Sequence, residues 1–381
     1  MATLFTKRHV GVFIGRFQPF HNGHMAIIED AFNVGIKRLR IFIGSANQQR
    51  TLRNPFTYAE RLSMIVETLR ERFASYDIRC TRMKAPFDQD VEMATIGCEE
   101  LGYINIYPLN DYMYNEAMWT TDVLKSTYAH IHDGDKVILL GYKKDMSSYY
   151  LDIFPEFDTH FVTEPAESAG KIMNATDFRK IFFMAPDEAT AINAMEGVMP
   201  APAGRILVSF MRSDTYTDLV KEYKYIDQYK KSWEKAPYPP IFVTADALVQ
   251  QGNRILLIRR KHVPGKGLWA LPGGFVNPEE PIKEGMLREL REETGVELPY
   301  KVLNGSIVST TVVDTPGRSE RGRTITHVFH IKLDAKAGAL PKVSGNSDAS
   351  DARWFRFDEV SSMKHLMFED HGDIINKVLG I

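Results

Sequence analysis

The stretch VGVFIGRFQPFHNGHMAIIEDAF, residues 10–32, decides the fold of the first half of the chain. It begins with an apolar, β-branched run, passes through a turn that contains glycine and proline, and continues as an amphipathic helical pattern. Similar apolar runs recur, so that the predicted strands are Val10 to Ile14, Leu39 to Ile43, Ile104 to Tyr107 and Val137 to Leu140. This alternation predicts an α/β fold with a doubly wound parallel sheet. Because ligands bind beyond the carboxyl ends of such strands, we expect the chemistry just after Ile14 and Leu140.

Length and composition indicate two ordinary globular domains. The chain has 381 residues, which exceeds the usual size of one domain, and 44% of them are hydrophobic and 25% charged. The net charge of -2 gives no overall attraction to nucleic acid or to an anionic membrane. The only cysteines, Cys80 and Cys98, fit no metal or redox motif, and the first residues resemble neither a signal peptide nor a membrane span. We therefore expect a cytoplasmic protein.

A proline-rich segment marks the predicted domain boundary. The helical pattern from Thr217 to Trp233 runs into APYPP at 236–240, which cannot continue a helix. We place the first domain at 1–235, with a core at about 8–185 plus a C-terminal helical segment, and the second at 236–381. The second begins with a predicted hairpin, IFVTADALVQ and RILLIRRK joined at Gly252-Asn253, followed by a glycine-rich loop and a highly charged helix.

Two histidines, His21 and His24, lie at the turn between the first strand and its helix. The N-terminus of a helix offers unpaired N–H groups and the positive end of a dipole to a phosphate. Imidazole N–H groups can add hydrogen bonds to oxygens on which charge develops during nucleotidyl transfer, and Arg16 can add a fixed positive charge. An isolated HxxH would more often only cap a helix, but here the strand, the turn and both histidines occur in order.

With these residues the chain resembles the HxGH nucleotidyltransferases, specifically the archaeal-type nicotinamide mononucleotide (NMN) adenylyltransferases. The resemblance extends over GSANQQRTLRNPFTYAER (44–61), NDYMYNEAMW (110–119), GYKKDMSSYYLDIFPEF (141–157) and NATDFR (174–179). It implies a Rossmann-like domain that makes NAD and pyrophosphate from ATP and NMN. The alternative is an HxGH transferase that acts on a pantetheine, glycerol or choline phosphate, against which the segments at 110–119 and 141–157 argue.

The resemblance also implies roles for individual residues. The 5′-phosphate of NMN would attack the α-phosphorus of ATP directly, with Mg²⁺ on the phosphates, His24 at the α-phosphate, and His21, Thr176 and Arg179 at the departing pyrophosphate. Asn174 replaces the serine of the family's SxTxxR segment. Trp119 would stack on the nicotinamide ring, or else it belongs to the core. Catalytic residues are thus His21, His24 and Arg179, and residues that bind ATP or NMN are Gly15, Arg16, Phe17, Asp111, Trp119, Gly141, Asp145, Asn174, Thr176 and Arg179.

Residues 274–296, GFVNPEEPIKEGMLRELREETGV, identify the second domain as a member of the Nudix hydrolases. The signature residues are Gly274, Glu280, Arg288, Glu289, Leu290, Glu292, Glu293, Gly295 and Val296. On a helix, Glu289, Glu292 and Glu293 gather on one side, where hard oxygen ligands suit Mg²⁺ or Mn²⁺ and Arg288 can orient one carboxylate. The alternative is an ordinary solvent-exposed helix face, on which Lys283 and Arg291 are the charge partners of the glutamates. The resemblance implies an α/β/α sandwich with a mixed sheet.

The chemistry implied for this domain is hydrolysis of a nucleoside diphosphate derivative. Glu289 or Glu293 would be the catalytic general base, or an acid from a loop such as Glu320, whereas His327 fits a structural position in a strand. Fusion to an NAD synthase favours ADP-ribose, split to AMP and ribose 5-phosphate, although Pro316 lies twenty residues past Val296 rather than about fifteen. The alternatives are another nucleoside diphosphate derivative, or a ligand-sensing module. Oligomeric state, preferred metal and use of nicotinate mononucleotide stay open.

Overall fold

The structure is a computed structural model that describes residues 8–74, 79–85, 88–98, 102–129, 131–141, 152–161, 175–335 and 338–380. It divides into two compact units, Met1–Val220 and Lys221–Ile381. The division falls inside helix α7 (Asp214–Ser232), which runs through most of the predicted 217–233 helix. The domain boundary that the sequence predicts, after residue 235, stays a prediction.

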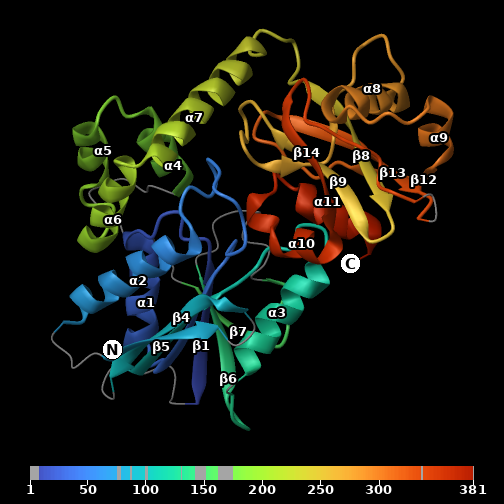
Figure 1. The fold of residues 1–381 in the computed structure, drawn as a ribbon. Coiled ribbons are helices and arrows are strands. Elements are labelled where there is room, and N and C mark those ends of the chain that lie inside the picture. Colours follow the sequence, from blue (N-terminus) through green and yellow to red (C-terminus); the bar gives the residue numbers. More distant parts are fainter. Residues whose placement is uncertain are drawn as a thin grey trace. The chain divides into compact units, whose positions relative to one another are not determined.

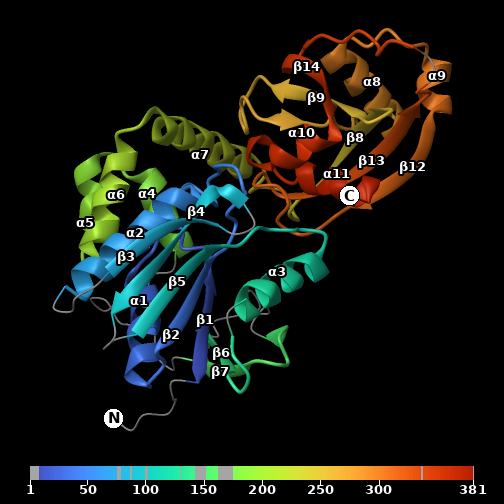
Figure 2. The same cartoon turned by 60° about the horizontal axis from the view of Figure 1, so that its bottom comes forward.

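The first unit is built on a seven-stranded sheet with the order β3-β4-β5-β2-β1-β6-β7 (Figures 1 and 2). Five neighbouring strands run parallel, and β3 and β4 add an antiparallel edge. The strands are β1 (His9–Gly15), β2 (Arg38–Ile43), β3 (Arg79–Ala85), β4 (Asp88–Cys98), β5 (Gly102–Pro108), β6 (Lys136–Gly141) and β7 (Asp158–Phe161). The four predicted strands are therefore confirmed within two residues at each end.

The order of the strands reverses at β1. The chain passes from β1 to β2 and β5 on one side, whereas β6 and β7 lie on the other, and Phe13 pairs with Leu140 across the junction. The carboxyl ends of β1 and β6 therefore form the point at which ligands bind in such sheets.

Six helices of this unit accompany the sheet within the described residues. They are α1 (Asn22–Asn33), α2 (Tyr58–Arg72), α3 (Glu116–Tyr128), α4 (Ala175–Met184), α5 (Glu188–Met195) and α6 (Ala201–Met211). Helix α6 packs on α2 through Phe210, whose ring centroid lies 5.1 Å from that of Phe56 just before α2. The central strands contribute fully buried side chains, as expected for strands that are covered on both faces.

The second unit contains a mixed sheet in which β8 and β13 are parallel and the other pairs antiparallel. Its strands are β8 (Ile241–Gln251), β9 (Arg254–Arg260), β10 (Trp269–Ala270), β11 (Gly273–Phe275), β12 (Ile307–Val313), β13 (Arg323–Leu333) and β14 (Ala349–Arg356). Its helices are α8 (Ile282–Thr294), α9 (Tyr300–Gly305), α10 (Phe357–Ser362), the 3-10 turn Lys364–Leu366 and α11 (His371–Leu379). The predicted hairpin corresponds to β8 and β9, which pair at their joined ends.

Helix α8 is fixed to this sheet by its apolar face. Met286, Leu287 and Leu290 are at most 2% exposed and pack into one core with residues of β8, β9 and β13. Gly295 ends the helix with a positive φ of 57° and donates its N–H to the carbonyl of Arg291. The acidic side chains of α8 thereby acquire a rigid support.

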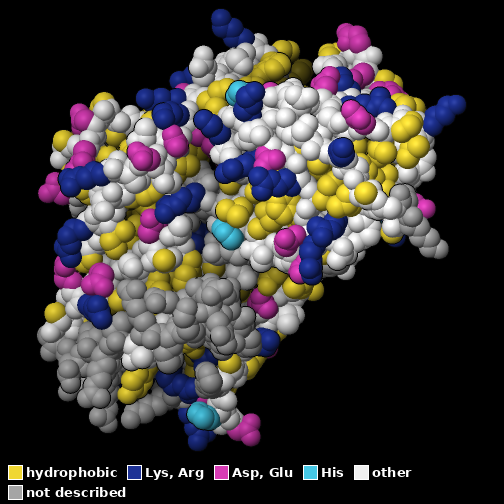
Figure 3. Space-filling view, in the orientation of Figure 1, with side chains coloured by type: hydrophobic (Ala, Val, Ile, Leu, Met, Phe, Trp, Pro, Cys, Tyr) yellow, Lys and Arg dark blue, Asp and Glu magenta, His cyan; other side chains and the backbone are white. Residues whose placement is uncertain are grey.

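The face of the molecule drawn in Figure 3 is mixed in charge. Over the face seen in Figure 3, Lys and Arg side chains are interspersed with Asp and Glu. Within the described ranges, no helix combines the length and the apolar character needed to cross a bilayer.

Candidate active sites

The turn after β1 is shaped by Phe17 and Gln18. Phe17 is buried with a φ of 52°, and its ring lies so close to Gly15 that a Cβ there would stand 2.8 Å from it. Gln18 is also buried, and its side chain exchanges two hydrogen bonds of 2.9 and 3.0 Å with the backbone of Phe56. Both residues hold the backbone between the strand and the histidines in one conformation.

The two predicted histidines lie together at the start of α1. Their rings stack with centroids 3.7 Å apart, and the His21 N–H donates to Nδ1 of His24 over 3.2 Å. The rings of Phe17 and Phe20 flank His24 at 4.8 and 5.6 Å. Burial, and then the neighbouring His21, lower the pKa of His24 well below 6.5. The ring is therefore neutral at pH 7, and because Nδ1 accepts a hydrogen bond, its proton lies on Nε2.

Helix α4 brings Arg179 and Thr176 to the same turn. Arg179 is buried and donates from Nη1 to the carbonyl of Gln18 over 2.9 Å and from Nη2 to Oγ1 of Thr176 over 3.2 Å. The structure thus joins the HxGH turn to the TDFR segment, which lies about 160 residues later in the sequence. Asn174 of that segment lies outside the described residues.

An arginine that the sequence did not single out braces the strand ends. Arg61 of α2 is 1% exposed and donates to the carbonyls of Arg16, Gly44 and Ser45 at 2.7, 2.5 and 3.0 Å. Burial lowers its pKa to about 10, so it still carries its charge at neutral pH. Nothing in the helical pattern around Arg61 distinguishes it from a solvated arginine.

The remaining predicted residues of this unit lie at other strand ends or on α3. Asp111, after β5, accepts from the Ser45 N–H over 3.2 Å and thereby ties two strand ends together. Trp119 of α3 is half-buried, and its ring centroid lies 5.8 Å from that of Phe154. Arg16 is exposed, and Gly141 ends β6. Asp145 lies outside the described residues.

In the second unit, Arg288 organises the acids of α8. Its guanidinium forms a bidentate pair with Glu280 at 3.0 and 2.7 Å and also donates to Glu289 at 2.8 Å and Glu292 at 3.1 Å. The hydrogen bonds from Arg288 and from the Asn277 backbone lower the pKa of Glu280 to about 2. The predicted orienting role of Arg288 thus extends to three carboxylates, with Glu280 as its main partner.

Glu289 and Glu293 lie against the glycine loop. Gly273 donates its N–H to Glu293 over 2.9 Å, and a Cβ on Gly274 would stand 2.6 Å from Oε1 of Glu289. Glu293 is 4% exposed, and burial is the main cause that raises its pKa to about 8. Burial also raises the pKa of Glu289. Glu292 is more exposed than either, so the predicted acidic face has two inner members and one outer member.

These carboxylates fit a divalent cation by their chemistry. Across the part of the chain that the structure describes, no three His, Cys, Asp or Glu side chains stand together as a formed metal site. Carboxylate oxygens are nevertheless the donors that Mg²⁺ and Mn²⁺ prefer. Burial is the main cause that raises the pKa values of Glu289 and Glu293, and neighbouring carboxylates add to it, so both effects disfavour ionisation of these acids without a counter-ion.

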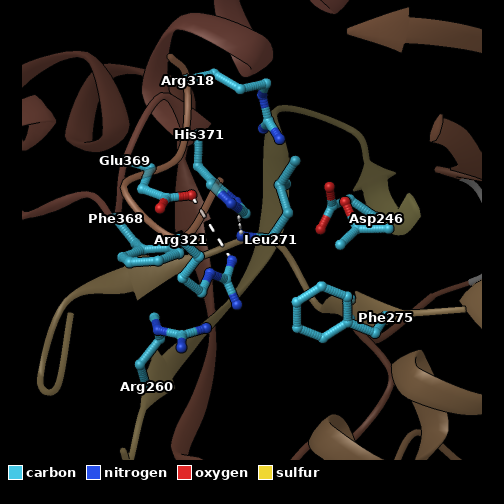
Figure 4. A pocket seen from close by; sticks show the side chains of 12 residues that line it. Asp246, Arg260, Leu271, Phe275, Arg318, Arg321, Phe368, Glu369 and His371 are labelled. Atoms are coloured by element: carbon cyan, nitrogen blue, oxygen red, sulfur yellow. Dashed lines mark hydrogen bonds and ion pairs between the residues drawn. The ribbon is translucent and has the colours of Figure 1, made fainter. Parts of the chain in front are cut away.

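A pocket opens beside the glycine loop, and its walls contain residues that sequence reasoning missed (Figure 4). Asp246 of β8 is 5% exposed, accepts a hydrogen bond from Oγ1 of Thr326, and has a pKa raised by burial to about 6. His371 accepts from the Leu271 N–H over 3.0 Å. The sequence contains one signal that could have identified Asp246 as a site residue, because this charged side chain interrupts the apolar strand TADALV.

Arginines and phenylalanines make up the rest of this pocket. Figure 4 shows the guanidinium groups of Arg260 and Arg321 with Phe368 on one side and Phe275 on the other. Arg260 lies 4.1 Å from the ring of Phe368, and Arg321 lies 5.0 Å from the ring of Phe275. Such a pocket suits an anionic ligand with a flat group.

The other two candidates from the sequence lie on β13 and the loop before it. His327 occupies a half-buried position of β13 and pairs in register with Ala245 of β8, and its structural role stays a prediction. Glu320 lies in the loop next to Arg321. Its part in water activation stays a prediction.

Comparison with known proteins gives two matching domains. The sequence profile of the NUDIX domain matches residues 240–378, and that of cytidylyltransferase-like proteins matches residues 12–97. The nicotinamide/nicotinic acid mononucleotide adenylyltransferase of Acinetobacter baylyi is 29% identical over 213 residues, which are 56% of this chain and 92% of that protein. The ADP-ribose pyrophosphatase of Methanocaldococcus jannaschii is 39% identical over 133 residues, 35% of this chain and 70% of that protein.

Solved structures from Francisella tularensis match both halves of the chain together. A bifunctional NMN adenylyltransferase/ADP ribose pyrophosphatase from Francisella tularensis is 35% identical, with a TM-score of 0.82, and the match covers 98% of each chain. A second crystal structure from that organism, complexed with AMP and a Mn ion, is 34% identical with a TM-score of 0.81 and covers the same 98% of each chain.

Proposed function

The chain belongs to the family of bifunctional NMN adenylyltransferase/ADP-ribose pyrophosphatases, and from this premise we propose that it carries out both reactions. The first unit joins ATP and NMN into NAD and pyrophosphate. The second, with a divalent metal, hydrolyses ADP-ribose to AMP and ribose 5-phosphate. One observation carries the proposal: the likeness to the Francisella protein extends over 98% of both chains, so it includes both sites.

Adenylyl transfer needs positioning and charge stabilisation rather than a covalent intermediate. The NMN phosphate attacks the α-phosphorus of ATP and expels pyrophosphate. We assign the Nε2–H of His24 to the oxygens of the α-phosphate. A neutral imidazole with a fixed tautomer supports this role, because it donates without needing to change its protonation state.

The pyrophosphate and the nicotinamide have their own proposed contacts. Arg179 and Thr176, joined by a 3.2 Å hydrogen bond, together with His21, bind the departing pyrophosphate. Half-buried Trp119 stacks on the nicotinamide ring. Further contacts to ATP or NMN are assigned to Gly15, Arg16, Phe17, Asp111, Gly141, Asp145 and Asn174.

In the second unit, Glu289, Glu292 and Glu293 would hold the metal. Mg²⁺ or Mn²⁺ would supply charge neutralisation for the diphosphate when bound. Arg288 keeps Glu289 and Glu292 oriented, and Gly273 holds Glu293 through its N–H. A carboxylate among Glu289, Glu293 and Glu320 takes the proton of the attacking water.

Two assays on the purified chain test both halves of the proposal. We expect NAD to form from ATP and NMN, and AMP and ribose 5-phosphate to form from ADP-ribose with Mg²⁺ or Mn²⁺ but not with excess EDTA. The variant with Glu292→Gln and Glu293→Gln should lose nearly all hydrolysis while NAD synthesis stays within about threefold.

Other outcomes would change specific parts of the proposal. Parallel loss of both activities in a folded double variant would contradict independent sites. Retained hydrolysis would remove these glutamates from the metal site. The hydrolase should also be assayed with a panel of nucleoside diphosphate derivatives, and the products identified by mass spectrometry. If another compound is cleaved faster than ADP-ribose, that compound replaces ADP-ribose as the proposed substrate.

A further inference from the structure

The C-terminal half of α7, residues 221–232, packs on the hydrolase unit rather than standing apart from it. Lys221 and all later residues belong to the second compact unit. Two separate paths of contact lead from this half-helix to the two pocket arginines described above. One path is aromatic and ends at Arg321, and the other is polar and ends at Arg260.

The aromatic path is a ladder of rings. Tyr229 of α7 lies 5.6 Å from Phe242 of β8, ring centroid to ring centroid, and Phe242 lies 5.9 Å from Phe275 of β11 in an edge-to-face arrangement. Phe275 then lies beneath the guanidinium of Arg321 at 5.0 Å. Aromatic pairs at these separations prefer defined geometries, so each ring restricts the next.

The polar path begins at Glu222. Its Oε2 accepts a hydrogen bond of 3.0 Å from the N–H of Gly265, and burial raises the pKa of this carboxyl. The preceding carbonyl, that of Pro264, accepts from Nε of Arg260 over 2.9 Å. Gly265 has a φ of 74°, and a Cβ on it would stand 2.2 Å from the ring of Phe368, on which Arg260 stacks. Glu222 thus fixes the loop that orients Arg260.

The pocket arginines differ in how far their charge is already balanced. Arg318 forms a buried bidentate pair with Asp370 at 2.9 and 2.7 Å, so its charge is balanced within the protein. By contrast, Nη2 of Arg321 lies 3.9 Å from Oε2 of its carboxylate neighbour Glu369. The guanidinium of Arg260 stacks on the ring of Phe368. Two cationic groups next to the loop that holds Glu293 have the chemistry to bind the diphosphate of a nucleoside diphosphate derivative.

We propose that residues 221–232 of α7 are a positioning element of the hydrolase pocket, which hold Arg321 and Arg260 where they bind the substrate's diphosphate. The inference rests on the proposed hydrolysis of a nucleoside diphosphate derivative, and it goes beyond that function by assigning substrate affinity to a helix outside the signature sequence. Tyr229 acts through Phe242 and Phe275, and it is not itself a catalytic residue.

Kinetics of full-length variants on ADP-ribose test this proposal. Tyr229→Ala should raise the KM about threefold to tenfold, the size expected for the loss of one aromatic pair, with kcat within twofold of the wild type. Arg321→Ala should raise the KM further. The double variant should have the KM of Arg321→Ala alone, because the tyrosine acts through the arginine. Tyr229→Phe keeps the ring and should rescue the KM.

A matched control and a substitute variant keep the test decisive. Tyr238→Ala removes a tyrosine that is 81% exposed, and its KM should equal that of the wild type. If Tyr229→Ala does not fold, Tyr229→Leu retains apolar bulk without the ring and should give the same rise. An unchanged KM, a fall in kcat alone, or effects that multiply in the double variant would overturn the proposal. Absence of hydrolysis by the wild type would instead count against the proposed function.

Discussion

Replacing the buried acid Glu293 by glutamine should stabilise the metal-free protein at high pH. In the folded unit, burial raises the pKa of Glu293 from 4.5 to about 8, so the side chain keeps its proton where a glutamate of the unfolded chain is ionised. Between these pH values the folded state binds one more proton than the unfolded state. The free energy of unfolding therefore falls as the pH rises through this window.

The size of the effect follows from the two pKa values. A change from 4.5 to about 8 corresponds to about 4 to 5 kcal/mol, at about 1.4 kcal/mol per pH unit. The carboxylate of Glu289 contributes part of this change and can itself take up a proton. We therefore expect Glu293→Gln to raise the free energy of unfolding by about 2 to 4 kcal/mol at pH 9 and by less than about 1 kcal/mol at pH 5. The amide can still accept the hydrogen bond from Gly273.

Urea denaturation in EDTA at pH 5, 7 and 9 measures this difference. Tryptophan fluorescence follows mainly the second unit, because Trp233, Trp269 and Trp354 belong to it and only Trp119 to the first. The exposed Glu279→Gln serves as the matched control and should change little at any pH. Equal stabilisation at pH 5 and pH 9, or destabilisation at pH 9, would refute the argument from burial.

Three further substitutions test individual contacts. His24→Ala should lower the rate of NAD formation at least about 10²-fold, because it deletes a donor to charge that develops in the transition state. A turnover near that of the wild type would remove His24 from catalysis. Trp119→Ala should raise the KM for NMN through lost stacking of about 1 to 2 kcal/mol, whereas an unchanged KM would return this side chain to the core. Gly274→Ala should cut hydrolysis more than tenfold, since its Cβ would stand 2.6 Å from Oε1 of Glu289 and push that carboxylate aside. Its melting temperature should change little, because the displaced group is the end of a flexible side chain, and unimpaired hydrolysis would contradict this steric reasoning.

The sequence predicts the first sheet well because its central strands are apolar on both faces. Val10 to Ile14 and Val137 to Leu140 stand out for that reason, and the observed strands extend them by one residue at each end. Strand β3 at one edge of the sheet and its neighbour β4 were not predicted. Their sequences, RCTRMKA and DQDVEMATIGC, mix charged and apolar residues without a continuous apolar run. The partners of such strands are set by tertiary contacts that the local sequence pattern does not encode.

The contacts within the candidate sites also differ in how well the sequence predicts them. His21 and His24, and the acids of α8, are close in sequence, so spacing alone predicts that they meet. The link from Arg179 to Gln18 spans 161 positions and was predictable only through resemblance to a family. The pocket arginines come from β9 and a loop before β13, and no local pattern joins them.

The bracing arginine of α2 bears on how a mutational map of this protein would be interpreted. Arg61 reaches three backbone carbonyls at two strand ends with a planar group that lysine cannot imitate. A saturation library selected for NAD production should therefore tolerate almost no other residue at this position. Read without the structure, such intolerance would place Arg61 among the ligands of ATP. Its cause would instead be the support that Arg61 gives to the backbone at two strand ends. Intolerance to substitution alone would therefore not distinguish a residue that contacts a substrate from one that holds the backbone in place.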